Sequence, residues 1–425
     1  MAGQVKWFSS ENINAPELSN NWGSLLNVLE ACLLTGYGNQ SIQGITIENG
    51  VATANFSAAH KLQMFQWIEI SGSNQADLNA EFKILGATSH SIEFLIDLPD
   101  QTITETLSCR LAPLGWSKPY SDEGRAVFQA KNTDNNPYYL RVDDTCDPLH
   151  NPSYGKFAKV GILEECTGID DISGPQAPFD PLLPTKNWIG TGTYNNSSAI
   201  IGWARWPYAI STSMNSSGVV IPGLYGAPPN GVKEWMLVGD DENFYILPAI
   251  YVKSSTDIYK NYTTCFGFGI FEGKDCPFLA TQHNYAAINQ SFSYGDNCTF
   301  TNANNGYLVL LKNRDGSYVT TNQITASGHD TRLNYAIGGP GATGATNHFT
   351  QHAEDGVYFN PFYAKDTKNT YLGPIPLLRY VLQATDAVGP MITTFNDGGH
   401  ALLRCKHVGG GRQYGSIIVD LGEMT

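Results

Sequence analysis

The chain has 425 residues, enough for two or three domains with a large core, and only 15% of them are charged against about 25% in an average soluble domain. With 12% aromatic residues, 43 glycines and 22 prolines, the composition predicts an all-β, loop-rich protein with extensive contact surface and excludes a disordered one. The net charge of −14 comes with basic residues scattered singly, which argues against a nucleic-acid partner.

Neither a membrane span nor a secretion signal is expected. No apolar run approaches the roughly 18 residues of a membrane-spanning helix. The first residues, MAGQVKWFSS, lack the apolar region of a signal peptide. We therefore expect synthesis and assembly in a cytoplasm, with no membrane partner.

Residues 1–38 are predicted to form an extended arm followed by an amphipathic helix. The helix is expected from Leu18 to Thr35, with Ser19 or Asn20 as its cap and Gly36 at its end. Its apolar residues recur every three or four positions: Leu18, Trp22, Leu25, Leu26, Leu29, Cys32 and Leu33. In a monomer the arm and helix would fold back on the nearest domain, and in an assembly they could equally pack on a neighbour. We favour the first, because a stripe of Leu and Trp is usually core.

Residues 39–114 carry the pattern of a small β-module. The runs VATANF, QWIEI, EFKIL and SIEFLI alternate in polarity, and TLSCRLAPL follows them. Turn-rich segments such as SGSNQAD and GATSH separate the runs. This spacing predicts a compact barrel or sandwich of about five strands that serves as a scaffold.

The rest of the chain divides into a loop-rich connecting region, residues 115–187, and a larger antiparallel β-sandwich region, residues 188–425. The connecting region contains the short strands YYLRVDD and AKVGILEE. It ends in QAPFDPLLPTKN, which is either a boundary or, as its apolar residues favour, a segment laid over a surface. The sandwich region is rich in strand patterns: AIIGWARW, GVVIPGLYG, EWMLVG, NFYILPAIYV, CFGFGIFEG, GYLVLLKN, ALLRCKHV and GSIIVDLG.

Gly339, Gly341 and Gly344 match G-x-G-x-x-G but do not indicate a dinucleotide site. That fingerprint follows a strand and opens a helix in a βαβ unit, whereas Pro340 and the missing helix pattern contradict this context. We interpret the segment as a surface loop.

His348 and His352 are spaced as two metal ligands on one helical turn, with Glu354 and Asp355 following. A zinc hydrolase would need Glu directly after the first histidine, where Phe349 stands. A metal site would also need a third ligand and supporting partners. We therefore interpret the pair as solvated loop histidines.

Two acidic pairs, Asp143–Asp144 and Asp170–Asp171, are the remaining candidates for glycosidase or calcium chemistry. Neighbouring residues on a strand point to opposite faces, whereas a glycosidase needs two carboxyls facing one cleft. A calcium loop would need spaced acids. We expect strand-end turns and exposed salt-bridge partners, and assign no catalytic, cofactor or metal-binding residue.

The eight cysteines include no CxxC pair, so a zinc ribbon is not indicated. In a reducing compartment the default is a free buried thiol that packs as a small apolar side chain. Disulfides formed after cell lysis remain the alternative.

Several segments carry a family resemblance. One is the order of an A-H-x-L corner, a strand ending in I-S-G, and L-N-x-E-F-x-I within the small β-module. The other landmarks are Lys6–Ser10, Leu111–Trp116, Tyr139–Asp144, Gln176–Pro181 and Gly202–Trp206. Together they resemble virion structural proteins of tailed bacteriophages from tail or baseplate gene clusters, over most of the first half of the chain.

The resemblance implies a place in a particle. We expect a non-enzymatic structural protein of the virion, in the tail tip or baseplate, that assembles with copies of itself and other virion proteins. A capsid decoration or head-fibre protein is one alternative. A receptor-binding or glycan-degrading tail protein is another, and an acidic cleft beside exposed Trp would favour it.

Overall fold

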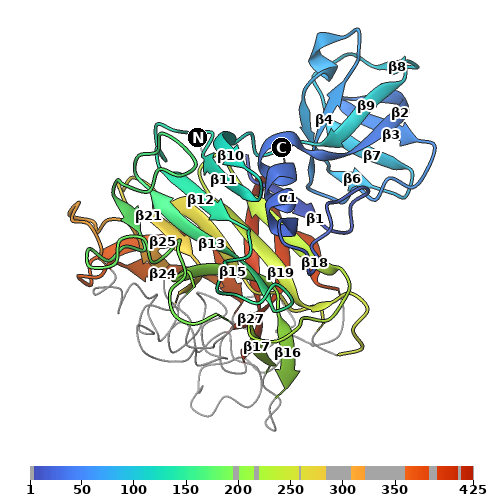
Figure 1. Cartoon of the computed structure of the whole chain (residues 1–425). Helices are drawn as coiled ribbons and strands as arrows, with labels where there is room; N and C mark the ends of the chain where they lie inside the picture. The colour runs from blue at the N-terminus through green and yellow to red at the C-terminus, as the bar shows by residue number, and fades with distance from the viewer. Residues whose placement is uncertain are drawn as a thin grey trace.

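The computed structural model describes residues 4–194, 201–214, 220–257, 260–283, 308–320, 359–381, 390–409 and 413–424. Antiparallel sheets dominate this part of the chain, so the predicted mainly β fold is confirmed (Figure 1). No helix among these residues is long and apolar enough to cross a membrane.

The small module is one curled sheet of eight strands that projects from one side of the molecule (Figure 1). Its strands in spatial order are β5 (Glu81–Lys83), β4 (Trp67–Ser71), β9 (Leu107–Leu111), β2 (Tyr37–Glu48), β3 (Val51–Phe56), β7 (Ser91–Leu95) and β6 (Gly86–Ala87), with β8 (Gln101–Ile103) also paired to β2. The rings of Phe82 in β5 and Phe94 in β7 lie 4.5 Å apart, although these strands are far apart in the sheet order. The sheet therefore curls around its own core, with eight strands where about five were predicted. The predicted runs correspond to β3, β4, β5, β7 and β9, and the structure adds β2, β6 and β8.

Three further sheets form most of the other described residues, and we call this part of the protein the body. The central sheet consists of β1 (Lys6–Ser9), β18 (Lys233–Gly239), β19 (Phe244–Val252), β20 (Phe266–Ile270), β21 (Pro277–Ala280) and β23 (Leu308–Leu310). The second sheet consists of β10 (Ser117–Asp122), β11 (Arg125–Gln129), β12 (Tyr139–Asp143), β13 (Lys156–Leu163), β15 (Ala204–Ala209) and β22 (Gln282–His283), with β14 (Gln176–Ala177) paired to β13. The third consists of β24 (Phe359–Lys365), β25 (Tyr371–Val381), β28 (Gln413–Glu423), β27 (His400–Gly409) and β26 (Ile392–Asp397). A separate hairpin pairs β16 (Ser211–Met214) with β17 (Val220–Gly223).

The central sheet is buried on both faces. Leu237 and Ile246 belong to the core shared with the second sheet, whereas Met236 and Leu247 belong to the core shared with the third. All nine residues of β19 are buried. A strand covered on both faces gains from apolar residues at every position, which explains why NFYILPAIYV is nearly continuous. The predicted sandwich is therefore a three-layer stack, and the region 115–187 supplies five of the strands of its second layer.

The N-terminal arm folds back, as we favoured. Its strand β1 pairs with β18 at the edge of the central sheet, and Trp7 and Phe8 enter the cores on opposite faces.

The helix is shorter than predicted. It comprises α1 (Ser24–Glu30) and a π-helical turn, η1 (Ala31–Thr35), and it ends at Gly36 as expected; a short 3₁₀ turn, η2 (Ala76–Leu78), lies in the small module. Neither Ser19 nor Asn20 caps it, because Leu18 is drawn into a β-bridge with Lys233.

The segment QAPFDPLLPTKN lies over the second sheet, as its apolar residues indicated. Gln176 accepts a hydrogen bond from the indole of Trp188 at 2.8 Å. Trp188 covers Gly161 of β13, where a Cβ atom would lie 2.6 Å from the indole ring. The Arg141 guanidinium also lies over the Trp188 ring, 4.3 Å from its centroid, in a cation–π contact.

Candidate functional site

Two of the sequence candidates lie outside the described residues: the glycine motif Gly339, Gly341 and Gly344, and His348 with His352, Glu354 and Asp355. Within the described ranges, no three His, Cys, Asp or Glu side chains gather as metal ligands.

Asp143 and Asp144 point to different surroundings, as neighbours on a strand should, but both are buried, so the expected exposed role is wrong for this pair. Asp143 and Asp147 both approach the ammonium of buried Lys159, at 3.1 and 3.5 Å. Lys159 also donates to the carbonyl of Trp188 at 2.8 Å. These acids and the lysine hold the covering segment onto the second sheet.

Asp144 caps the helix across a long stretch of sequence. Its Oδ2 accepts the backbone N–H groups of Leu25 and Leu26, and its Oδ1 accepts the Tyr208 hydroxyl at 2.6 Å. Burial raises the pKa of Asp144 to about 7, against the lowering effect of these donors. The Asp144 carboxylate therefore acts as the N-cap of the helix, because the residue at the N-cap position, Gly23, has no side chain to accept these hydrogen bonds.

Asp170 and Asp171 have the predicted exposed roles. Asp170 pairs with Arg125 at 2.6 Å. Asp171 accepts hydrogen bonds from the backbone and side chains of Thr167 and Ser173, which lower its pKa.

The described cysteines are all free, and every one except half-buried Cys146 is buried. This confirms the prediction of free buried thiols for six of the seven described cysteines; Cys146 is free but half-buried, and Cys298 lies outside the described residues.

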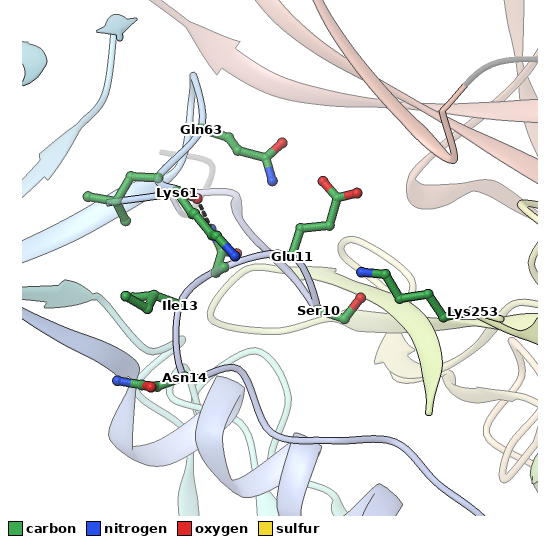
Figure 2. A pocket seen from close by; sticks show the side chains of 9 residues that line it. Ser10, Glu11, Ile13, Asn14, Lys61, Gln63 and Lys253 are labelled. Carbon is green, nitrogen blue, oxygen red and sulfur yellow. Dashed lines mark hydrogen bonds between the residues drawn. The ribbon is translucent and has the colours of Figure 1, made fainter. Parts of the chain in front are cut away.

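The candidate site is a polar groove of about 500 Å³ at the joint between the small module and the body (Figure 2). Three segments line it: the loop after β1, the corner before β4, and the end of β19. The lining residues are Ser10, Glu11, Asn12, Ile13, Asn14, Lys61, Leu62, Gln63 and Lys253. We call it the joint groove.

The floor of the joint groove is a closed amide network. Asn12 and Gln66, both buried, exchange two hydrogen bonds of 2.8 and 2.9 Å. Asn12 also donates to the carbonyl of Lys61 and accepts from the backbone of Ser9. Because every bond is buried or nearly so, this floor fixes the corner of the small module against the body.

The side chains at the rim of the joint groove, unlike those of its floor, are largely unpaired. Among the described residues, the side chains of Glu11, Asn14, Lys61 and Gln63 have no hydrogen-bond or ion-pair partner, and Lys253 makes only a 3.5 Å contact with Glu234. Figure 2 shows Glu11 between Lys61 and Lys253 in this view. The groove therefore offers two ammonium groups, one carboxylate and two amides to a ligand.

Strained backbone gathers at this place. Asn14, Lys61 and Phe65 have positive φ angles of 51°, 52° and 67°, which side chains other than glycine adopt at a cost. Hydrogen bonds stabilise two of these conformations. Asn12 donates to the carbonyl of Lys61, and the N–H group of Phe65 donates to the carbonyl of Ile84. Such strain, retained by surrounding structure, is typical of functional positions.

Two lysines rigidify the joint. Lys6 of the central sheet binds Glu81 at 2.6 Å and the carbonyl of Pro113 at 2.7 Å. Lys83 of the small module donates to the carbonyls of Leu421 and Glu423 at 2.7 and 2.9 Å. These contacts tie the small module to the body at two further places.

Sequence reasoning missed this groove because its lining comes from three distant segments. The only local signal was the A-H-x-L corner, which contains Lys61 and which the resemblance singled out without a role.

The fold and groove define an antiparallel, multilayer β-protein with a rigidly attached module and a polar joint. Comparison with known proteins adds no relative: no protein-family model matches the chain, and no curated protein matches it significantly.

Proposed function

We propose that this chain is a non-enzymatic structural protein of a tailed-phage virion, acting in the tail tip or baseplate through assembly with itself and other virion proteins. The family resemblance in the first half of the chain motivates the proposal. The fold supports the proposal because the small module is rigidly connected to the body.

The observation that carries the proposal is the stiff connection between the small module and the body. One continuous hydrophobic core includes residues of both, from Ile42 to Phe244, and the Lys6 and Lys83 contacts bridge them at the surface. A subunit that repeats around a symmetry axis must hold its contact surfaces at a constant angle. A rigid two-part shape meets this requirement.

Exposed tryptophan does not supply the contact surfaces. All eight tryptophans lie in described parts and each is buried or half-buried. Among the described residues, the exposed large apolar side chains come mainly from loops and strand ends: Val51, Met64, Leu95, Leu182, Ile189, Tyr194, Tyr318, Tyr363 and Tyr371. Assembly through tyrosine and aliphatic side chains is consistent with interface composition in general.

Copy number in purified particles tests the proposal. Quantitative mass spectrometry should find three, six or twelve copies per particle for a tail-tip or baseplate protein. Hundreds of copies would instead assign a capsid decoration or head-fibre role. Absence from the particles would overturn the structural proposal.

One observation favours receptor binding as the second candidate. The rings of Tyr363 and Tyr371 lie 6.0 Å apart, with exposed fractions of 36% and 54%. Paired exposed rings provide a surface on which the C–H faces of a sugar can stack. Screening the protein against host envelope glycans tests both binding and hydrolysis, and turnover would contradict the non-enzymatic proposal.

A further inference from the structure

We propose that the joint groove binds an extended, acidic peptide segment from a neighbouring subunit. The identity of the partner rests on the proposed function, whereas the recognition of acidic peptide rests only on the groove.

Charge contrast is the first argument. The chain carries 39 acidic and 25 basic residues, so its surface as a whole repels acidic partners. The joint groove is less acidic than the chain as a whole: Lys61 and Lys253 line it beside one lining acid, Glu11, and Glu234 contacts Lys253 at 3.5 Å. Both lysines are exposed, and the Lys61 ammonium has no partner among the described residues.

Hydrogen-bonding capacity is the second argument, and it favours a peptide over a simple anion. The side chains of Asn14 and Gln63 each offer a donor and an acceptor, which matches the alternating C=O and N–H groups of an extended backbone. The Glu11 carboxylate can only accept hydrogen bonds, so it suits the N–H groups of a peptide backbone.

Preorganisation is the third argument. The hydrogen bonds between Asn12 and Gln66 fix the floor of the groove without a ligand. The rim residues Asn14 and Lys61 already have the positive φ angles that set the direction of their side chains. A fixed groove avoids the ordering cost that a flexible loop would incur on binding. The segment that docks would then lock a neighbour against both the small module and the body.

The test uses the full chain and a fluorescein-labelled octapeptide of alternating glycine and aspartate, measured by fluorescence anisotropy at low salt. A matched peptide of glycine and asparagine provides the neutral comparison. We expect saturable binding of the acidic peptide that weakens as salt rises. Lys61→Glu and Lys253→Glu should each weaken it about fivefold or more.

Lys131→Glu is the control, because Lys131 is an exposed lysine that does not line the groove. It makes the same change in net charge and should leave binding within about twofold. Thermal unfolding of all three variants checks that the fold persists.

Three results would overturn the inference: equal binding of the acidic and neutral peptides, equal weakening by Lys131→Glu, or displacement by tripolyphosphate at lower concentration than by unlabelled peptide. The particle measurement decides the proposed function separately. A protein absent from virions that still binds acidic peptide at Lys61 and Lys253 would refute the function alone, and a virion protein without this binding would refute the inference alone.

Discussion

A single carboxylate, Asp144, connects three parts of the chain. It lies at the end of β12, receives the N–H groups at the start of α1, and accepts the hydroxyl of Tyr208 in β15. A buried acceptor that satisfies several donors stabilises all of them together, because each donor would otherwise lose its bond to water. The same burial that makes the contact strong also raises the pKa of Asp144.

The pKa of Asp144 predicts a pH dependence of stability. Its folded value of about 7 exceeds the value of about 3.9 in an unfolded chain, so between these values the folded state binds the proton more tightly. The stabilisation from this group is therefore complete below about pH 4 and is lost as the pH rises through 7, by at most about 4 kcal/mol.

Asp144→Asn removes the titration while retaining an acceptor. Measured by denaturant unfolding from pH 4 to 8, the difference in unfolding free energy between wild type and variant should shrink or reverse as the pH rises. Parallel curves over this range would refute the assignment.

The contact between Gly161 and Trp188 requires that residue 161 has no side chain. A Cβ on Gly161 would lie 2.6 Å from the Trp188 ring, so Gly161→Ala should displace the indole and cost about 1–3 kcal/mol of unfolding free energy. Gly168→Ala is the matched control, since a Cβ there meets nothing within 4 Å, and it should be nearly neutral. Near-ultraviolet circular dichroism reports the indole directly, and an unchanged spectrum in Gly161→Ala would contradict the prediction.

At the scale of the element, tertiary contacts make the N-terminal helix shorter than its apolar repeat predicts. The apolar spacing from Leu18 onward continues the helical repeat, but Leu18 forms a β-bridge with Lys233 and the helix begins only at Ser24. From Leu25 to Leu33 the predicted stripe is buried. The periodicity identified the buried face, while competition with the central sheet decided where the helix begins.

The buried stripe predicts the effect of a charge on α1. Leu29 is fully buried, so Leu29→Asp should cost about 3–5 kcal/mol, because an unpaired carboxylate would be placed in the core. Asn27→Asp adds an acid on the exposed side of the same helix and should change stability by less than about 0.5 kcal/mol. Chemical denaturation of the two variants checks the contrast, and similar losses in both would show that the stripe is not core.

At the scale of the whole molecule, the cores on both faces of the central sheet enclose most of the described thiols. Burial raises the pKa of Cys109 and of Cys405 to about 12, and it also raises the pKa of half-buried Cys146. The reactive thiolate is therefore scarce in the native protein.

Thiol labelling tests this enclosure. In the native protein we expect slow reaction, with half-buried Cys146 first among the described cysteines, and eight free groups after denaturation without reductant. Fast labelling of Cys32, Cys265 or Cys405, or fewer than eight groups after unfolding, would contradict the fold or the free-thiol assignment.

The sequence by itself determined the β class, five of the eight strands of the small module and the end of the helix at Gly36, and it favoured a folded-back arm. These features depend on alternation, apolar runs and glycine, which act over a few residues. Only the tertiary structure decided that one sheet is buried on both faces, that Asp143 and Asp144 are interior, and that Lys61, Lys253 and Glu11 share a groove. Each of these depends on which distant segments meet, and local patterns do not encode that choice because many pairings bury the same apolar residues.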